Sequence, residues 1–476
     1  MSFAVSTPAV STPAAAPGRG APAGRPDPRG LLRAHWPLLP LVATVLMLLV
    51  PVPAGDATAS GKVGPADAAS LVLVLVCALR ALRGEVRPLT RLGAVVLALP
   101  TIGLAVATAT AGDPYAALPG FVRYLQVFVL VPGAVLLLVR DAREFRLAAW
   151  CFVVLAVVQG AVGVVQYATH TGASYQGEDI RAVGTFGPGD VMGMATVVAY
   201  GLVVATGAAL SAALPQASRR VATCCALALV LPLVLSFSRG AWIATAGAAL
   251  VVLLLAGVRR ALVVLVALGA AGVVLVGGFG VGSQMVAERL TSITQVGSAP
   301  DQSVTDRYTM WAAASSMWQE RPAVGVGLKG FPAHRDGHAG LGLSSGSDTA
   351  GAGQAYVRQP LLSPHNMYLL ILSEQGLVGL LALAGGWAVL LVAGLRRVLR
   401  PDPAARRARD CGLIALGLFV WQLTDFLYAD IGGPSTVLTG VIIGLAAWGA
   451  FADTGGGPGR ADAAVPWRAR EGTAVR

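Results

Sequence analysis

The sequence predicts an all-α polytopic integral membrane protein, with about twelve transmembrane helices and one long extracytoplasmic loop that carries amphipathic helices. Hydrophobic residues make up 55% of the 476 positions and charged residues only 12%, and the mean hydropathy is +0.69. A soluble globular chain carries about 25% charged residues. The arginines gather in short segments between apolar runs, as orientation signals do. The net charge of +11 therefore does not indicate a nucleic-acid partner.

Each span is predicted from an apolar run long enough to cross the bilayer. A helix needs roughly 20 such residues to cross a hydrocarbon core about 30 Å thick. Because two of the runs are short, ten or eleven spans remain alternatives to twelve. The predicted spans cover residues 36–53, 67–83, 92–110, 119–139, 147–168, 190–213, 220–237, 240–257, 261–279, 376–395, 411–428 and 433–451.

The arginines also set the expected orientation. With the N-terminus in the cytoplasm, the predicted inner loops hold most of the arginines between spans, and the short outer loops hold few basic residues. The inner set is Arg83, Arg87, Arg91, Arg140, Arg143, Arg146, Arg219, Arg220, Arg259, Arg260, Arg396, Arg397, Arg400, Arg406, Arg407 and Arg409. The outer set is Lys62, Arg181 and Arg239. We therefore expect a multi-pass protein of the plasma (cytoplasmic) membrane with both termini in the cytoplasm.

The chain is expected to divide into five parts. Residues 1–33 and 453–476 have the composition of disordered cytoplasmic tails, and the first has no apolar stretch of the kind that a signal peptide needs. Spans one to nine occupy residues 34–279, the long extracytoplasmic loop 280–365, and spans ten to twelve 366–452. The five cysteines lie in or beside apolar runs and are interpreted as small hydrophobic residues, not as disulfide partners or metal ligands.

The long loop is expected to be functional, because loops of this length are uncommon without a role. In its middle, a set of larger side chains recurs at spacings of four and three residues. This set is Val304, Tyr308, Trp311, Ser315 and Trp318. The spacing predicts an amphipathic helix with an aromatic stripe, which would lie on the membrane or on the helix bundle.

Four arginines on the outer side are candidate ligands for an anion. Arg239 lies in a tight turn, Arg181 precedes a glycine-rich turn, and Arg307 lies on the predicted amphipathic helix. Arg123 lies one turn inside the outer end of the fourth span. A cation in such a place is costly unless it is paired. As alternatives, Arg239 and Arg123 could snorkel to the interface, Arg307 could pair with Asp306, and Arg181 could belong to a plain turn.

His365 is the candidate general base. The preceding Pro364 favours the first turn of a helix, with Ser363 as its cap. A helix N-terminus disfavours imidazolium, so the ring should be neutral and able to accept a proton. Asn366 follows directly, and Glu374 could orient the histidine or an arginine, or could fill a packing defect. The alternative is a hydrogen-bonded interfacial histidine with no catalytic role.

Arginines beside a neutral histidine favour one kind of chemistry. Guanidinium groups can hold a lipid-linked diphosphate as it leaves, and the histidine can deprotonate an acceptor hydroxyl. The sequence has no outer Asp-x-Asp, no Glu-x-x-His and no cluster of His and Cys. We therefore expect a metal-independent transfer with no cofactor.

Four segments carry a resemblance to a known family: Arg181–Gly189 (RAVGTFGPG), Ser236–Trp242 (SFSRGAW), Asp306–Phe331 and Pro364–Gly379. Together they resemble the O-antigen ligase and O-antigen polymerase superfamily of membrane glycosyltransferases, over residues 180–395. The resemblance implies that Arg239 and Arg307 bind the lipid diphosphate and that His365 activates the acceptor. Where the family commonly has Asn-Pro-Asn, this chain has Pro188-Gly189-Asp190, which weakens the case for Arg181.

The combined interpretation is a glycosyltransferase of the ligase or polymerase type. It would transfer a glycan from a polyprenyl diphosphate carrier such as undecaprenyl diphosphate to a glycan or lipid acceptor at the outer face of the bilayer, in cell-surface polysaccharide biosynthesis. His365, Arg239 and Arg307 would be catalytic, and Arg181, Arg123, Glu374 and Asn366 would support substrate binding. Ligase and polymerase stay open because they differ only in the acceptor.

Two other classes remain as alternatives. A small-anion or polysaccharide-related transporter predicts ionisable groups near the bilayer midplane and broken helices in paired repeats. A non-catalytic partner of a polysaccharide assembly machinery predicts that changing His365 affects stability alone.

Overall fold

The computed structural model describes residues 36–51, 64–175, 178–190, 192–273, 302–340, 342–344, 347–349, 357–359, 361–400 and 408–452. The chain divides into two units, Met1–Trp36 and Pro37–Arg476, and every described residue except Trp36 belongs to the second. Both tails expected from the sequence, 1–33 and 453–476, lie outside the described residues.

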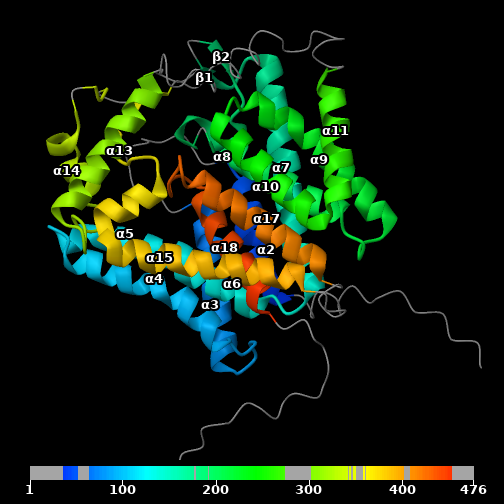
Figure 1. Ribbon diagram of the computed structural model, residues 1–476, viewed down its shortest axis with the longest axis horizontal. Coiled ribbons are helices and arrows are strands. Elements are labelled where there is room, and N and C mark those ends of the chain that lie inside the picture. The colour runs from blue at the N-terminus through cyan, green and yellow to red at the C-terminus, as the bar shows by residue number, and fades with distance from the viewer. Residues whose placement is uncertain are drawn as a thin grey trace, which may run out of the picture. The chain divides into compact units, whose positions relative to one another are not determined.

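Helices dominate the described residues, as predicted (Figure 1). The helices of the predicted spans are η1 (Trp36–Leu38), α2 (Leu39–Leu46), η2 (Met47–Leu49), α3 (Pro65–Leu82), α4 (Arg91–Ala109), α5 (Pro114–Leu125), η3 (Gln126–Leu130), α6 (Val131–Leu138), α7 (Ala142–Thr169), α8 (Gly193–Ala209), α9 (Gln216–Leu235), α10 (Arg239–Ala256), α11 (Val258–Val273), α15 (Met367–Leu399), α17 (Arg409–Asp425) and α18 (Thr436–Phe451). Outside them lie η4 (Gly184–Asp190), α13 (Gln302–Glu320) and α14 (Phe331–His338).

The structure also contains two short antiparallel strand pairs, which the all-α prediction did not include. Strands β1 (Ala173–Tyr175) and β2 (Glu178–Arg181) pair antiparallel, and so do β3 (Ser347–Thr349) and β4 (Val357–Gln359). Strands this short carry too little alternation of apolar and polar residues to be recognised in the sequence.

Among the described residues, seven helices are long and apolar enough to cross a membrane, and three shorter apolar helices accompany them. This is the pattern of a polytopic membrane protein. Each predicted span overlaps a helix, but α11 and α17 belong to neither group. The count of twelve spans therefore stays a prediction, as does the extracytoplasmic position of the loop.

Small residues let neighbouring helices approach closely. A Cβ at Gly444 of α18 would lie 2.5 Å from the Cβ of Val135 and 2.9 Å from the carbonyl oxygen of Pro132, both on α6. A Cβ at Gly201 of α8 would lie 2.1 Å from the Cβ of Ala156 on α7. Glycine is therefore required at both contacts, as is common where helices pack in membranes.

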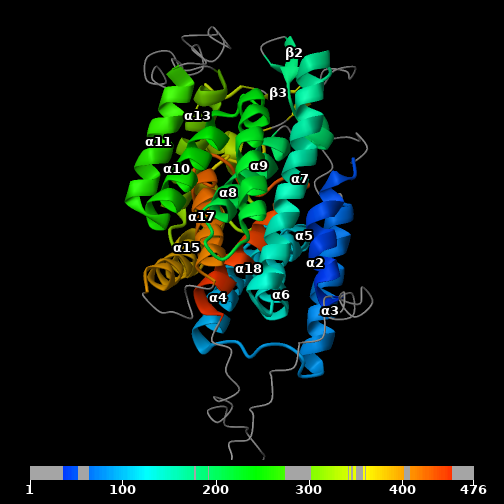
Figure 2. The ribbon, with the colours of Figure 1, turned by 90° about the vertical axis from the view of Figure 1, so that its right-hand side faces the viewer.

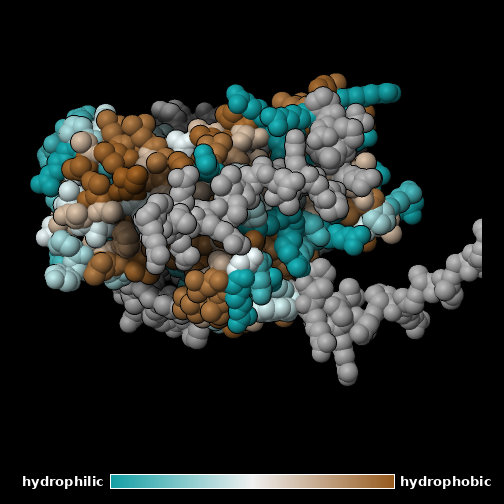
Figure 3. All heavy atoms as spheres, turned by 90° about the horizontal axis from the view of Figure 1, so that it is seen from below, coloured by the Kyte–Doolittle hydropathy of each residue, from teal (hydrophilic) through white to brown (hydrophobic). Residues whose placement is uncertain are grey.

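Large apolar side chains also lie on the outside of the bundle. On α3, Leu71, Leu75 and Leu79 follow one another by one helical turn and are 59%, 53% and 54% exposed. Figure 3 shows hydrophobic side chains gathered into broad areas of the described surface, with hydrophilic ones between them. An apolar outer stripe of this kind suits contact with lipid better than contact with water.

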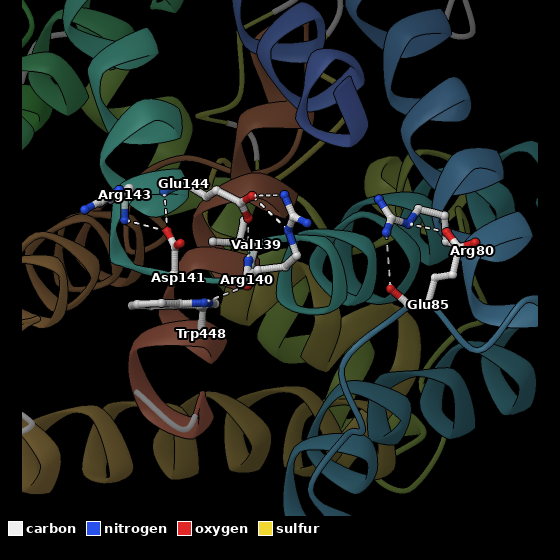
Figure 4. Close-up of polar contacts among 8 residues, drawn as sticks. All are labelled: Arg80, Glu85, Val139, Arg140, Asp141, Arg143, Glu144 and Trp448. Atoms are coloured by element: carbon white, nitrogen blue, oxygen red, sulfur yellow. Dashed lines mark hydrogen bonds and ion pairs between the residues drawn. The ribbon is translucent and has the colours of Figure 1, made fainter. Parts of the chain in front are cut away.

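The connection between α6 and α7, which is predicted to face the cytoplasm, is held by its own polar groups (Figure 4). The backbone N–H and the Nε–H of Arg140 donate to Glu144 at 2.6 Å and 2.9 Å, and Glu144 is only 2% exposed. Asp141 caps α7 by accepting from the backbone N–H of Glu144 at 2.9 Å. The Nε1–H of Trp448 donates to the carbonyl of Val139 at 2.9 Å, which joins α18 to the same connection.

Some arginines of the predicted inner set thus have structural partners. The Nε of Arg146 lies 2.8 Å from Oδ2 of Asp410 and joins α7 to α17. Figure 2 shows β2, β3 and α13 at one end of the described bundle and the α3–α4 connection at the other. The segments with the candidate site residues therefore lie away from the α3–α4 connection, whereas the orientation of the bundle in the membrane stays a prediction.

Candidate active site

The turn that carries His365 is held by the residue after it. Asn366 is the N-cap of α15, and its Oδ1 accepts from the backbone N–H of Leu369 at 3.0 Å. Its Nδ2 donates to the carbonyl of Leu427 at 2.8 Å, and the backbone N–H of Met367 donates into the same α17–α18 connection. These bonds fix the start of α15 against that connection.

His365 lies just outside α15. The prediction that Ser363 caps the helix and that His365 sits in its first turn was wrong, because α15 begins at Met367 with Asn366 as its cap. The Asn366 side chain accepts from the Leu369 N–H and donates to the Leu427 carbonyl, so this residue both caps α15 and ties the cap to the α17–α18 connection. The backbone of His365 has a φ of 48°. Such a left-handed conformation costs on the order of 1–3 kcal/mol outside glycine, so the bonds of Asn366 have to hold it.

The predicted amphipathic helix is confirmed as α13, but it packs through a different face. Its buried face is Asp306, Met310, Ala313, Ala314 and Met317. The predicted aromatic stripe lies beside that face, and Tyr308 is 50% exposed. Alanine and methionine allow a closer fit against α15 than the indoles would, and Figure 1 shows α13 next to the first turns of α15.

One indole of α13 reaches the histidine turn. The Nε1–H of Trp311 donates to the carbonyl of Pro364 at 2.8 Å. The ring of Tyr308 packs edge-on against Trp311, with 5.5 Å between the ring centroids. Arg307 lies about one helical turn before Trp311, so the same helix brings its guanidinium toward His365.

Arg181 ends β2 and reaches the turn before α10. Its Nε–H donates to the carbonyl of Ser236 at 3.0 Å, and its Nη2 lies 3.2 Å from Sδ of Met192. Burial lowers the pKa of Arg181 to about 10, and the positive charge of Arg307 is the second cause. The group stays charged at neutral pH, so two positive charges lie close enough to repel each other.

Arg239 opens α10 on a turn that its neighbours shape. The side chain of Ser238 caps the helix. A Cβ at Gly240 would lie 2.2 Å from the ring of Tyr428, and the Tyr428 hydroxyl donates to the Gly240 carbonyl. The Ser-Arg-Gly turn therefore packs on the α17–α18 connection, the segment that also receives Asn366.

Burial favours the neutral form of His365, and the two charges that act on the ring oppose each other. Burial lowers the pKa of His365, the carboxylate of Asp430 opposes this shift, and the guanidinium of Arg307 adds to it. The ring can therefore accept a proton at neutral pH. The sequence predicted a neutral ring, but burial is its main cause and the helix terminus is not.

The histidine, both arginine-bearing turns and the loop helix α13 thus lie around the α17–α18 connection. Residues 224–384, from α9 into α15, match the family model described as O-Antigen ligase. Residues 224–384 form an O-antigen ligase domain. The family predicted from the sequence is therefore confirmed, and the domain includes Arg239, Arg307 and His365. No curated protein matches the chain.

Arg123 lies outside the O-antigen ligase domain and has a partner of its own. Its Nη1 forms an ion pair with Oδ1 of Asp67 on α3 and also donates to Oε1 of Gln126 at 3.1 Å. Gln126 in turn donates to Ser70 at 2.7 Å. The sequence left snorkelling and ligand binding open for Arg123, and the structure instead places it in a network that joins α3 to α5 and η3.

Glu374, inside the O-antigen ligase domain, holds a loop. It is 1% exposed, and its Oε1 accepts from the backbone N–H of Phe331 at 3.2 Å. Nearby, α15 is broken at Gly376, where φ is 63° and a Cβ would lie 2.3 Å from the carbonyl oxygen of Ala323. The expectation that Glu374 orients His365 or an arginine does not match these contacts, which tie α15 to the turn between α13 and α14.

Two carboxylates near the end of α17 were not predicted from the sequence as site residues. Asp425 ends α17 and interacts electrostatically with Arg307, and Asp430 interacts with His365. The sequence signal was that acids are rare, since the chain has only 24 acidic residues. Asp425 is the last residue of α17, and Asp430 follows within the connection to α18. Acids at helix ends are common, so their position alone does not predict a functional role.

Asp190 is a further acid that the sequence did not single out. It ends the glycine-rich turn η4, and its Oδ2 accepts from the hydroxyl of Ser435 at 3.0 Å. Burial raises the pKa of Asp190 to about 6 despite this bond. The Pro188-Gly189-Asp190 departure from the family pattern therefore coincides with a contact between η4 and the α17–α18 connection.

Within the ranges that the structure describes, no group of three His, Cys, Asp or Glu side chains could hold a metal ion. Metal-independent transfer and the absence of a cofactor stay predictions.

Proposed function

We propose that this protein transfers a glycan from a polyprenyl diphosphate to an acceptor hydroxyl at the outer face of the plasma membrane, as a step in cell-surface polysaccharide biosynthesis. One observation carries the proposal. A histidine whose pKa is lowered lies within electrostatic reach of Arg307, which in turn lies close to Arg181. A neutral base beside clustered guanidinium groups suits displacement of a diphosphate. The O-antigen ligase domain supports glycosyl transfer as the reaction class.

In the proposed step, the neutral ring of His365 takes the proton of the acceptor hydroxyl. The acceptor oxygen then forms a bond to the anomeric carbon of the donor glycan, and the bond from that carbon to the diphosphate oxygen breaks. The electron pair of the broken bond stays on the polyprenyl diphosphate. The histidine finally releases its proton to water, so each turnover moves one proton from the acceptor to the outside.

The guanidinium groups of Arg181 and Arg307 would be the part of the site that receives the diphosphate. Burial is the main cause of the lowered pKa of Arg181, and the like charge of Arg307 adds to it. A diphosphate between them would turn this repulsion into attraction and offer bidentate hydrogen bonds. Arg239, at the start of α10, would add a third guanidinium at a helix N-terminus, whose dipole favours an anion.

The acceptor distinguishes a ligase from a polymerase. A ligase passes the glycan to a lipid or other envelope acceptor, and a polymerase passes it to another lipid-linked glycan. The residues that carry the proposed chemistry serve both reactions, so both remain open, with the bilayer and a polysaccharide assembly machinery as the surroundings.

The test uses cells that lack the gene and compares wild type with His365→Asn. Asparagine tolerates the left-handed backbone of position 365 better than alanine, but it cannot act as a base. The matched control is His170→Asn, since His170 is exposed and also left-handed, with a φ of 53°. We expect His365→Asn to insert normally, lose the polymer and accumulate the lipid-linked precursor, whereas His170→Asn should behave as wild type.

Arg307→Lys gives a second comparison, because lysine keeps the charge and loses the bidentate geometry. We expect it to weaken use of the donor. If His365→Asn and Arg307→Lys both make polymer at the wild-type level, the proposed transferase function is wrong, and transport or scaffolding becomes the leading account.

A further inference from the structure

Several buried polar side-chain atoms lack a hydrogen-bond partner in the described part of the chain, and three of them come from three separate segments. They are Oη of Tyr124 on α5, Oε2 of Glu374 on α15 and Oδ2 of Asp430 in the α17–α18 connection. Tyr124 and Glu374 are each only 1% exposed. Buried polar groups are nearly always hydrogen-bonded, so a partner from outside the chain is the natural explanation for three such atoms.

The three atoms belong to one cluster. Glu374 and Asp430 both act electrostatically on Tyr124, and Asp430 also acts on Glu374. The ammonium of Lys329 lies 5.8 Å from the centroid of the Tyr124 ring and acts on Glu374. We name Tyr124, Lys329, Glu374 and Asp430 the carboxylate cluster. It combines two acceptors, one donor and one hydroxyl that can do both.

The carboxylate cluster adjoins the proposed base. Asp430 is the member that acts on His365, and it raises the pKa of the ring while Arg307 lowers it. One anionic group and one cationic group therefore act on His365. Two carboxylates repel a diphosphate, so the donor phosphate belongs on the side of Arg307. A neutral group rich in hydroxyls suits the carboxylate cluster.

We infer that the carboxylate cluster binds hydroxyl groups of the acceptor sugar and holds the acceptor next to His365. This inference rests on the proposed function and adds the acceptor subsite to it. Glu374 and Asp430 would accept hydrogen bonds from sugar hydroxyls, and Lys329 would donate one. Charge-assisted bonds of this kind are about twice as strong as neutral ones.

Packing alone does not account for the Tyr124 hydroxyl. The ring of Tyr124 packs on Phe128 with 5.6 Å between centroids, and a phenylalanine would fill the same space. The hydroxyl adds an unpaired polar atom to this contact, which stabilises nothing in the protein without ligand. It is therefore the group whose removal best separates binding from folding.

The experiment uses the full chain reconstituted in vesicles with its lipid-linked donor. The acceptor probe is envelope material from cells that lack the gene, titrated at fixed donor concentration. The variants are Tyr124→Phe and Glu374→Gln, the second of which keeps an oxygen for the Phe331 N–H. The matched control is Tyr200→Phe, because the buried Tyr200 hydroxyl donates to Gln422 at 2.6 Å within the protein.

We expect Tyr124→Phe to raise the acceptor KM about fivefold, the effect of one lost hydrogen bond, and Glu374→Gln to raise it about tenfold. The donor KM should stay unchanged in both. The melting temperature of Tyr124→Phe should equal or exceed that of wild type. Tyr200→Phe should show the reverse pattern, with a lower melting temperature and an unchanged acceptor KM.

His365→Asn in the same assay distinguishes a failure of the proposed function from a failure of the acceptor subsite alone. If it transfers glycan at the wild-type rate, the proposed function fails and this inference fails with it. If His365→Asn is inactive while Tyr124→Phe and Glu374→Gln have the acceptor KM of wild type, the inference alone is overturned. A fall in melting temperature of Tyr124→Phe with no change in acceptor KM would likewise overturn it, since the hydroxyl would then be a structural group.

Discussion

Replacing Asn366 by alanine should release the histidine turn without removing the base or either clustered arginine. The Asn366 side chain makes two hydrogen bonds, one to the Leu369 N–H and one to the Leu427 carbonyl. Loss of the cap costs about 1 kcal/mol, and loss of the bond to Leu427 costs about 1 kcal/mol more. The sum of about 2 kcal/mol is comparable with the cost of the left-handed backbone at His365, so the turn should relax.

The size of the effect on catalysis follows from that sum. If all of it appears as a smaller population of the competent turn, kcat falls about 30-fold, since 1.4 kcal/mol corresponds to about a factor of ten. Asn366→Asp keeps the oxygen that caps α15 and loses the donor to Leu427, so we expect a smaller fall of about fivefold. The assay measures kcat and both KM values in vesicles, with the melting temperature of each variant.

Two results would refute this reasoning. If Asn366→Ala raises the KM for donor or acceptor and leaves kcat unchanged, Asn366 contacts substrate, as the sequence first suggested. If Asn366→Ala has the kcat and the melting temperature of wild type, the two hydrogen bonds do not hold the turn.

Three further predictions address other parts of the site. Gly376→Ala should lower the free energy of unfolding by on the order of 3 kcal/mol or more and reduce the protein level in membranes. The added Cβ would lie 2.3 Å from the carbonyl oxygen of Ala323, at a residue whose φ is 63°. Gly385→Ala on the same helix is the control, because its Cβ would meet nothing within 4 Å and the change should be tolerated. Asp430→Asn removes the charge that raises the pKa of His365, so the acid limb of kcat against pH should move to lower pH; a shift to higher pH would contradict the assignment. For Asp190, a folded pKa of about 6 against an ordinary value of 3.8 means that the free energy of unfolding falls as pH rises between these values. Asp190→Asn should therefore raise stability at pH 8 by about 1–2 kcal/mol, allowing for partial exposure, and should not raise it at pH 4; equal melting shifts at the two pH values would argue against the titration of Asp190.

Long apolar runs made most of the helices predictable, because a run of that length has few other folded environments. The predicted span at 376–395 shows where this failed. α15 begins at Met367, and the polar Ser373, Glu374 and Gln375 that interrupt the apolar pattern are all buried. Their environment comes from the turn between α13 and α14, which is distant in the chain. A local pattern carries no signal for such a contact.

The site residues were predictable to the extent that an outer cation or a lone histidine is rare in an apolar chain. Their partners were not predictable. Arg123 and Asp67 are 56 residues apart, and Trp311 and Pro364 are 53 apart. Each pair joins segments that only the fold brings together, so Arg123 was predicted from the sequence to have the same supporting role as Arg181.

The outer arginines differ in the group that interacts with each guanidinium. Arg123 faces a carboxylate, which leaves little reason for a ligand there. The hydrogen bonds of Arg181 go to a carbonyl and a thioether, and the charge that acts on it is a second arginine, Arg307. Holding two like charges close together costs free energy in the protein without substrate, and a bound anion would offset this cost. Asp430 and Arg307 both act on His365, and an anion is favoured beside the guanidinium and disfavoured beside the carboxylate. In the proposed function His365, which interacts with both groups, is the residue that both substrates would have to reach.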